Sequence, residues 1–333
     1  MMLVYDLNRD RFDPVLPEAS AEGRVYADQV VLAESFRVRH GAAPDLRRHR
    51  DRFLDGWYRL SAQPETAGLV PCLSGGTAQI EHMWWRGIQT LSEHVTDRPN
   101  PTTERPDLFP RIAVEIPQRS ARDAPTPKVT LSLRVAAPFR QITRLWIPAT
   151  PDPRRYPMIK GPDLARLATF TQDSRATAIR EADVDIDDVA RHDGRAVCGA
   201  CCAALAMVDD DQLVLLSGQA RLPSTSLAWL QQACAETGGT FGAMRITADT
   251  VLLDDFLRRV TDPQAGGAIY FNAHRGPSAV ILAGAENTVA NVGRTSVSQD
   301  LLEWVESLRL RWLDSFRPVE QQWRQGITEV VPG

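Results

Sequence analysis

The sequence is nearly devoid of lysine. Lys128 and Lys160 are its two lysines, and the rest of its 38 basic residues are arginine. A GC-rich coding bias accounts for such a composition, because arginine serves most surface roles of lysine. A guanidinium stays protonated, however, and cannot form a Schiff base. We therefore examine both lysines as candidates for chemistry that arginine cannot perform.

The sequence also lacks a long hydrophobic run. No apolar stretch approaches the roughly 20 residues that cross a bilayer, so no membrane segment is expected. The first residues, Met1 to Asp6, contain no basic segment followed by an apolar one, so we expect no secretory signal and a cytoplasmic location. The formal net charge of -4 provides no basic field for nucleic acid.

Cysteine is scarce and odd in number. The five cysteines are Cys72, Cys198, Cys201, Cys202 and Cys234. In a chain of this length such a count does not indicate a disulfide framework, and reduced thiols are expected. Three of them form a CxxCC motif, but a metal site needs about four ligands and no companion pair has metal-binding spacing. We expect small, part-buried residues there and no bound metal.

What is present is the composition of a folded protein. The chain has 333 residues, a length that is enough for two domains. Apolar residues make up 43% of it and charged residues 24%, as in other folded proteins. A proline-rich connector at 149–157 is the best candidate for a domain boundary. We therefore predict a smaller N-terminal α+β domain at 1–148 and a larger C-terminal domain at 158–333.

Hydrophobic spacing predicts mixed secondary structure. Alternating apolar residues predict strands at 2–6, 29–38, 111–116, 129–135, 196–197, 213–216, 245–246 and 268–271. Apolar residues three and four apart predict helices at 46–60, 77–95, 164–181, 225–237, 252–260 and 298–316. The fold class is therefore α+β or mixed α/β.

Lys160 has the surroundings of a reactive amine. It lies between the apolar pair Met158-Ile159 and the pair Gly161-Pro162, just after the connector and just before a predicted helix. Partial desolvation lowers the pKa of an amine and exposes its neutral, nucleophilic form. The alternative is a solvated lysine in a turn. Lys128 follows a proline-rich stretch, and we interpret it as a solvated loop residue.

Five blocks of the sequence resemble one family. The segment 160–164, with the helix after it, and the segment 193–200 resemble the lysine and the "DGRVxEGA" strand of the fold-type IV pyridoxal-phosphate (PLP) enzymes. This is the class IV aminotransferase and aminodeoxychorismate-lyase group. In the same order, 49–52 resembles its "HxxR" motif, 222–226 its "LPG(I/V)T" motif and 272–277 its "NAxxG" loop.

The resemblance implies a two-domain fold like that of the D-amino-acid and branched-chain aminotransferases, with PLP as cofactor. It implies that Lys160 forms a Schiff base with PLP and that Arg52 binds the cofactor phosphate. Thr225 and Ser226 would add an anion site at a helix N-terminus, and Asn272 would lie beside the cofactor. The alternatives are a solvated helix face for Arg52, N-capping for the two hydroxyls and an ordinary turn for Asn272.

One position departs from the family pattern. The glutamate that pairs with the pyridine nitrogen in the family falls on Cys198, and no shift of the alignment restores an acid. A carboxylate keeps that nitrogen protonated, which makes the ring an electron sink; a thiol does so only if ionised. The tyrosine expected shortly after the lysine is also absent. Either the ring is used in a less protonated form, or the protein has moved away from PLP.

The leading hypothesis is a PLP-dependent enzyme acting on an amino acid or amino-carboxylate, by elimination (lyase) or aminotransferase chemistry through Lys160. The alternative is a diverged family member that no longer uses PLP, either a cofactor-independent enzyme or a binding protein. The sequence does not separate transamination from elimination and does not name the substrate. From the resemblance we also expect a homodimer.

Overall fold

The structure is a computed structural model that divides the chain into two compact units. Unit 1 comprises Met1–Ala137, Ile159–Pro162 and Ser315–Gly333, and unit 2 comprises Pro138–Met158 and Asp163–Asp314. The residues that the structure describes are 1–6, 8–15, 29–63, 76–96, 106–116, 128–209, 211–218, 221–241, 244–262, 266–285 and 297–330.

Unit 1 contains an antiparallel sheet in the order β2-β1-β6-β5-β3. Its strands are β1 (Met2–Asp6), β2 (Arg11–Pro14), β3 (Gln29–Ser35), β5 (Arg111–Ile116) and β6 (Lys128–Ser132). A separate short pair joins β4 (Ala42–Ala43) to β16 (Arg317–Pro318). The register pairs Glu34 of β3 with Ile112 of β5, so β3 forms an edge of the main sheet.

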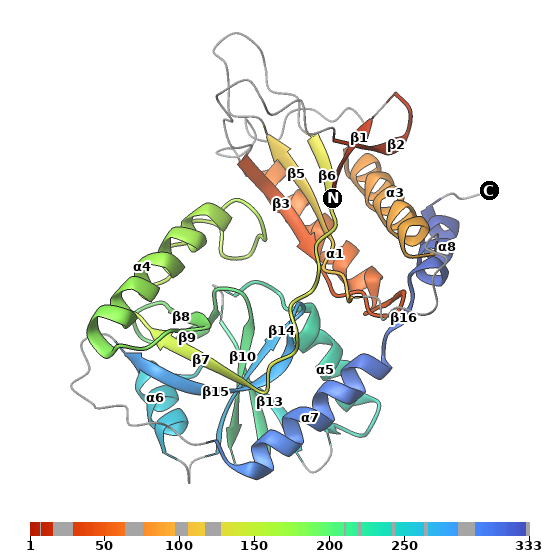
Figure 1. The fold of residues 1–333 in the computed structure, drawn as a ribbon. Helices are drawn as coiled ribbons and strands as arrows, with labels where there is room; N and C mark the ends of the chain where they lie inside the picture. The colour runs from red at the N-terminus through yellow and green to blue at the C-terminus, as the bar shows by residue number, and fades with distance from the viewer. Residues whose placement is uncertain are drawn as a thin grey trace, which may run out of the picture. The chain divides into compact units, whose positions relative to one another are not determined.

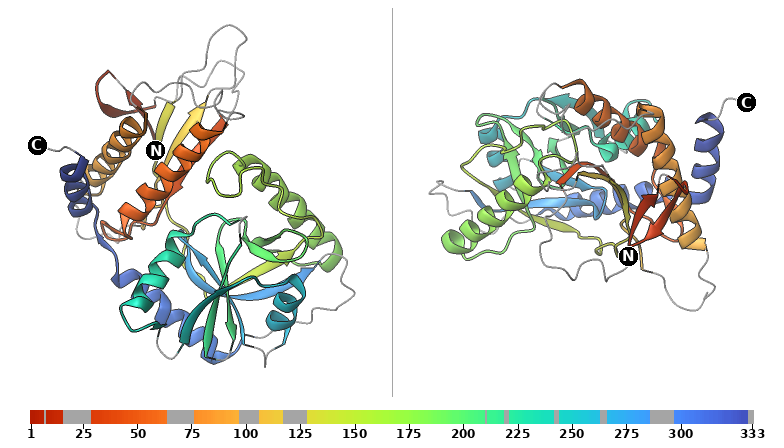
Figure 2. Two further views of the ribbon diagram at one scale, coloured as in Figure 1. Left: turned by 180° about the vertical axis from the view of Figure 1, so that it is seen from behind. Right: turned by 90° about the horizontal axis from the view of Figure 1, so that it is seen from above.

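The helices of unit 1 are α1 (Leu46–Ala62), α3 (Gly76–Thr96) and α8 (Val319–Val330). Asp45 begins α1 by accepting a hydrogen bond from the Arg47 N–H, as an N-cap does. Helices α1 and α3 lie side by side in both Figure 1 and Figure 2 and pack through the buried rings of Phe53 and Trp84. Helix α8 packs on α3, where a side chain at Gly326 would collide with the Trp85 ring.

Unit 2 contains a larger sheet in the order β12-β13-β11-β10-β14-β15-β7-β8-β9. Strand β7 pairs in parallel with β15 and β8, and β11 pairs in parallel with β13. The strand bounds are β7 (Ile142–Ile147), β8 (Asp188–His192), β9 (Val197–Ala200), β10 (Ala204–Asp209), β11 (Gln212–Leu216), β12 (Thr240–Phe241), β13 (Met244–Asp249), β14 (Gly267–Asn272) and β15 (Gly276–Ala285).

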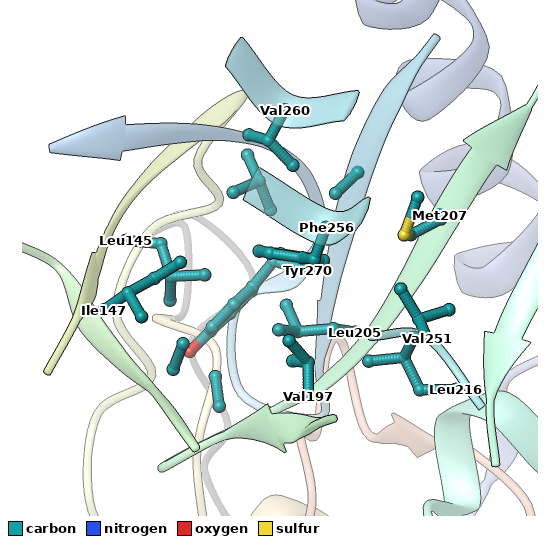
Figure 3. Close-up of a cluster of buried hydrophobic side chains, with 14 of the residues drawn as sticks. Leu145, Ile147, Val197, Leu205, Met207, Leu216, Val251, Phe256, Val260 and Tyr270 are labelled. Carbon is teal, nitrogen blue, oxygen red and sulfur yellow. The ribbon is translucent and has the colours of Figure 1, made fainter. Parts of the chain in front are cut away.

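Four helices surround this sheet: α4 (Leu164–Ala182), α5 (Thr225–Ala235), α6 (Leu253–Thr261) and α7 (Gln299–Asp314). Helix α7 packs along β15, while α6 packs on β14 and β15 (Figure 1). Phe256 of α6 is fully buried, and Figure 3 shows it beside the Tyr270 ring in an apolar cluster that also includes Leu145 and Leu205. This core holds the strands that carry the predicted site residues of unit 2.

The mixed α and β architecture predicted from the sequence is confirmed. The six predicted helices are present, and their ends lie within two residues of the predicted ones. Helix α8 was not predicted, nor were several strands, among them β7, β8, β10 and β15. Strand β7 has six residues whose apolar side chains do not alternate with polar ones, because Thr143 and Arg144 are adjacent. Helix α8 packs on α3, which is far from it in the sequence.

The two units differ from the predicted domains in three places. Strand β7 already belongs to the sheet of unit 2, so the connector at 149–157 lies inside that unit. The short segment Ile159–Pro162 belongs to unit 1, because the Ala33 N–H donates to the Lys160 carbonyl. The C-terminal segment Ser315–Gly333 also returns to unit 1 through the pairing of β16 with β4.

Candidate functional site

Lys160 lies beside the edge strand β3 of unit 1. The Ala33 N–H donates to its carbonyl oxygen at 2.7 Å. The next residue must be small, since a Cβ on Gly161 would lie 2.5 Å from the Val31 carbonyl oxygen and 2.6 Å from Leu32. Glycine therefore allows the segment to lie against β3, and this fixes the backbone from which the lysine side chain extends.

The amine of Lys160 is paired with a buried carboxylate. Its Nζ lies 3.3 Å from Oε1 of Glu34, and its side chain is 24% exposed. Burial, with the nearby cations of Arg52 and Arg111, lowers the pKa of Lys160 to about 8, although Glu34 opposes the shift. A substantial fraction of this amine is therefore neutral near pH 8, whereas an ordinary lysine is almost fully protonated there.

Glu34 is the centre of this cluster and is fully buried. Arg52 binds both of its oxygens, from Nε to Oε2 at 2.8 Å and from Nη2 to Oε1 at 2.5 Å. The Nδ1 of His49 lies 2.9 Å from Oε1. Burial alone would raise the pKa of Glu34, but Arg52, Lys160 and the bond to His49 together hold it well below its usual value. The side chain is therefore an anion.

Helix α1 positions both partners of Glu34. His49 and Arg52 are three residues apart and so lie on one face of the helix, the face that packs on β3. Burial lowers the pKa of His49 despite the opposing effect of Glu34. A neutral ring that donates Nδ1–H to the ionised Glu34 satisfies both groups.

The predicted lysine and the predicted arginine are therefore brought together within unit 1. The two donors of Arg52 that hold Glu34 belong to the planar fork that suits phosphate. Its predicted contact with a phosphate stays a prediction. The sequence prediction missed Glu34, which connects the two.

In unit 2, Cys198 lies on β9 with 9% of its surface exposed. Burial raises the pKa of its thiol, and the carboxylates of Asp193 and Asp152 raise it further. The thiol is therefore neutral at physiological pH. Its Sγ lies 3.7 Å from the Ala196 carbonyl oxygen. The pairing of Cys198 with a cofactor ring nitrogen stays a prediction.

The carboxylate of Asp152 is already occupied. Arg154 binds it through Nε and Nη2, at 3.0 and 2.7 Å, and its backbone N–H donates to Oδ1 at 3.1 Å. Arg191 adds Nη1 at 2.6 Å from Oδ2. Together with a second contact of the Arg154 Nε, these bonds fill the roughly four acceptor sites of a carboxylate. Asp152 therefore belongs to a buried arginine–aspartate–arginine cluster and has no acceptor left for a ligand.

The N-terminus of α5 carries the predicted hydroxyls. Ser224 is the N-cap, and its hydroxyl accepts from the Leu227 N–H at 3.2 Å. Capping is therefore performed by the residue before the predicted pair. Thr225 and Ser226 are 8% and 5% exposed, and within the described parts of the chain their hydroxyls make no hydrogen bond. These groups, with the backbone N–H groups beside them, suit an anion.

The side chain of Asn272 forms hydrogen bonds to the β14–β15 hairpin and to the Cys202 carbonyl. Its Nδ2 donates to the Cys202 carbonyl at 2.6 Å and to the Tyr270 hydroxyl at 3.3 Å. Its Oδ1 accepts from the N–H groups of His274 and Arg275, at 2.6 and 3.1 Å. These bonds use the whole capacity of an amide. The turn explains the residue, and its contact with a cofactor stays a prediction.

Next to Asn272, a buried carboxyl forms a network that the sequence did not indicate. The Tyr270 hydroxyl donates to Oδ2 of Asp188 at 2.9 Å, and the Cys202 N–H donates to the same oxygen at 3.0 Å. Burial raises the pKa of Asp188 to about 6 despite these bonds. The network ties β8 and β14 to the turn after β9.

The described residues contain no group of three or more side chains that could hold a metal ion. Cys198, Cys201, Cys202 and Cys234 are free thiols, and Cys72 lies outside the described residues. No helix in the described ranges is long and apolar enough to cross a membrane.

No protein-family model matches the chain, and no curated protein matches it. Solved structures do. A hypothetical aminotransferase from Mycobacterium tuberculosis, in its PLP-bound form, superposes with a TM-score of 0.61 and 12% identity, over 93% of this chain and 99% of that one. A fold IV transaminase from Curtobacterium pusillum gives a TM-score of 0.64 and 14% identity, over 94% and 98%.

A branched-chain aminotransferase from Thermoproteus uzoniensis with norvaline gives a TM-score of 0.62 and 13% identity, over 96% of this chain and 98% of that chain. At such low identity the likeness shows the fold. The chain has the fold of the fold-type IV aminotransferases, which confirms the fold predicted from the sequence.

Proposed function

We propose that this protein is a PLP-dependent enzyme that acts on an amino acid or amino-carboxylate, with Lys160 as its reactive amine. One observation carries the proposal: in a chain of two lysines, the amine of Lys160 is held by buried Glu34 with its pKa lowered to about 8. Its setting in a fold-type IV architecture supports the same conclusion.

Each unit by itself contains groups whose chemistry suits PLP. In unit 1, the lowered pKa of Lys160 suits reaction with an aldehyde. In unit 2, the buried hydroxyls and backbone N–H groups at the start of α5 suit a phosphate. Arg52 is proposed as a further phosphate ligand, and Asn272 as a neighbour of the cofactor. The ring-nitrogen position, at Cys198, departs from the family.

PLP, when bound, supplies an electrophilic ring system that stabilises negative charge at the substrate α carbon. The chain's own residues manage the proton on Lys160. The neutral amine is the reactive form, and Glu34 is placed to hold the proton at Nζ when the amine is charged. Arg52 and His49 keep Glu34 ionised and fixed in position. After release from the cofactor, the same amine is the base proposed to act at the α carbon.

Cys198 bears on the kind of reaction. A thiol with a raised pKa gives the ring nitrogen no negative partner, so the proposed enzyme works with a weaker electron sink. We propose lyase or aminotransferase chemistry, and the weaker electron sink does not decide between the two. We also propose a homodimer, on the strength of the family resemblance.

A second function is favoured by specific contacts. The guanidinium of Arg52 binds Glu34, and the amide of Asn272 is fully used by its bonds to the Cys202 carbonyl and to its own hairpin. A protein that had given up PLP would keep such internal contacts within the same fold. This alternative is a cofactor-independent enzyme or a binding protein of the same fold.

Titration of the purified full-length protein with PLP separates the two. The proposal predicts a visible absorbance that saturates with PLP, persists in Lys128→Ala and is absent in Lys160→Ala. The two variants remove the two lysines of the chain one at a time, so each is the control for the other. A spectrum equal to that of free PLP in all three proteins would support the cofactor-independent alternative.

A further inference from the structure

The backbone of Cys202, in the turn between β9 and β10, is held on both sides by side chains of unit 2. Its N–H donates to Oδ2 of Asp188 at 3.0 Å, and its carbonyl accepts from Nδ2 of Asn272 at 2.6 Å. The Tyr270 hydroxyl joins these two side chains, because it donates to Oδ2 of Asp188 and accepts from Nδ2 of Asn272. Asp188, Tyr270, Asn272 and Cys202 therefore form a closed ring of hydrogen bonds, the Asp188 ring.

Asp188 is a buried carboxyl whose hydrogen-bond donors are all neutral. The residue is 2% exposed. Its Oδ2 accepts from the Tyr270 hydroxyl and the Cys202 N–H, and its Oδ1 accepts from the Val189 N–H at 2.8 Å. Within the described part of the chain, no lysine, arginine or histidine forms an ion pair with it, and the cation that acts on it, Arg275, does so without a hydrogen bond.

Two other buried carboxylates of the chain are different. Glu34 is bound by the guanidinium of Arg52 and by the amine of Lys160. Asp152 is bound by two guanidinium groups, those of Arg154 and Arg191. Each of these anions has a cation in direct contact, whereas Asp188 has none.

A carboxylate without a cation is costly to bury. The Tyr270 ring beside Asp188 lies in the apolar cluster of Figure 3. Burial raises the pKa of Asp188 to about 6, although its three hydrogen bonds and Arg275 oppose the shift. The ionised carboxylate is therefore less stable in the closed ring than in water, and its ionisation favours any movement that exposes it to water.

Other ionisable and charged groups face Asp188 from the neighbouring segments. They are the Tyr270 hydroxyl from β14, the thiols of Cys201 and Cys202 from the turn, and Arg275 from the β14–β15 hairpin. Burial raises the pKa of Tyr270 and of Cys201, so both stay protonated where Asp188 titrates. Charged neighbours on α4 and β7 pair with other carboxylates: Arg175 with Asp185, and Arg144 with Asp187.

We propose that Asp188 is a pH-sensitive latch, closed over the turn between β9 and β10 when it is protonated and loosened when it gives its proton to water. Opening releases the backbone of Cys202 and the two hydrogen bonds that Nδ2 of Asn272 donates within the ring. The latch thus controls whether the Asn272 amide is available to a ligand. The device lies wholly within unit 2 and does not depend on PLP.

Amide hydrogen exchange at Cys202 measures the opening, in the full-length protein without PLP and with the intrinsic exchange rate divided out. An exposed aspartate ionises near pH 3.9, and Asp188 in the closed ring near 6. The opening constant should therefore rise about ten-fold from pH 5 to pH 7 and level off above that. At pH 7 the Cys202 amide should exchange faster than the amides of α7, which report global unfolding. Protection that is constant with pH, or that increases as the pH rises, would overturn the proposal.

Three variants assign the effect to its residue. Asp188→Asn keeps the size of the side chain and an acceptor oxygen but cannot ionise, so the pH dependence should disappear. Asp185→Asn is the matched control, because this carboxyl lies in the same connection between α4 and β8 and is 60% exposed; it should behave like wild type. Tyr270→Phe removes a donor that lowers the pKa of Asp188, so the opening should level off at a higher pH. This shift tests the latch even if Asp188→Asn does not fold. A pH dependence that persists in Asp188→Asn, or a downward shift in Tyr270→Phe, would refute it.

The outcomes are separate from those of the proposed function. A Lys160-dependent absorbance with PLP, together with a Cys202 amide that ignores pH, overturns the latch alone. A Cys202 amide that follows the expected pH profile, in a protein that never gives this absorbance, supports the latch and removes the PLP function.

Discussion

The amine of Lys160 lies 3.3 Å from Oε1 of Glu34, a residue 126 positions earlier in the chain. Glu34 is fully buried and is also bound by Arg52 and His49. One carboxylate thus holds an amine, a guanidinium and an imidazole. This arrangement predicts a distinct effect when Lys160 or Glu34 is replaced.

Replacing Lys160 should abolish activity and leave the fold intact. In Lys160→Ala, Glu34 keeps Arg52 and His49 as partners, so no buried charge is left unpaired. Circular dichroism and turnover on one preparation would check this, with Lys128→Ala as the control that keeps both. Full activity in a folded Lys160→Ala protein would eliminate a covalent role for the lysine.

The reactivity of Lys160 should rise with pH around a midpoint near 8. The neutral amine reacts, and the pKa of Lys160 is lowered to about 8 by burial and by nearby cations. Below that pH the amine is protonated and its reaction with PLP should slow. The rate at which the PLP absorbance develops, measured across pH, gives the midpoint.

Glu34→Gln should move this midpoint to lower pH. Glu34 opposes the lowering of the Lys160 pKa, so its removal destabilises the charged amine further. A midpoint near that of an ordinary lysine in wild type, or an upward shift in Glu34→Gln, would contradict the electrostatic account.

Glu34→Gln should also destabilise the protein strongly. It leaves Arg52 without the carboxylate that binds both of its donors, and breaking a buried ion pair costs about 3–5 kcal/mol. Asp51→Asn, on the same helix, removes a carboxylate that is 62% exposed and should cost less than about 1 kcal/mol. Denaturant unfolding measures both.

The difference in unfolding free energy between wild type and Glu34→Gln should change with pH in a defined direction. The pKa of Glu34 is held well below its unfolded value, so its contribution is fully present above that value. As the pH falls below about 4.3, the unfolded state takes up the proton first and the contribution declines. The gap between wild type and Glu34→Gln should therefore narrow in acid. A stability difference that does not change with pH would show that packing, and not the charge of Glu34, explains the loss of stability in Glu34→Gln.

Cys198→Glu should restore a negative partner at the ring-nitrogen position. An anion beside the pyridine nitrogen favours its protonated form, so the half-reaction of bound PLP with amino acids should speed up. Cys198→Gln, of the same size without the charge, is the control. Without PLP the glutamate variant should be less stable, because Asp152 and Asp193 already act on this site. A half-reaction that stays at background while PLP is bound would refute the role of Cys198.

Some of this site could be predicted from the sequence. Lys160 was indicated because lysine is so rare in the chain and because its neighbours are apolar. Arg52 was indicated by the resemblance of 49–52 to the family's HxxR motif. The capping of α5 by a hydroxyl followed from the turn before it, but which of three hydroxyl residues caps the helix needed the backbone.

The rest depended on contacts between distant segments. Glu34 is one charge in an apolar strand, and its significance comes from α1 and the Lys160 segment packing against it. A charged residue at a buried strand position was the signal that could have revealed it. The compact units differ from the predicted domains at β7, because its parallel pairing with β15 joins residues far apart in the chain.

The most direct test of the central claim is covalent trapping. The full-length protein is incubated with PLP, reduced with borohydride and mapped by peptide mass spectrometry. The account predicts a phosphopyridoxyl group on Lys160, with Lys128 left unmodified as the internal control. An unmodified Lys160 at saturating PLP, or modification of Lys128 to the same extent, would contradict it.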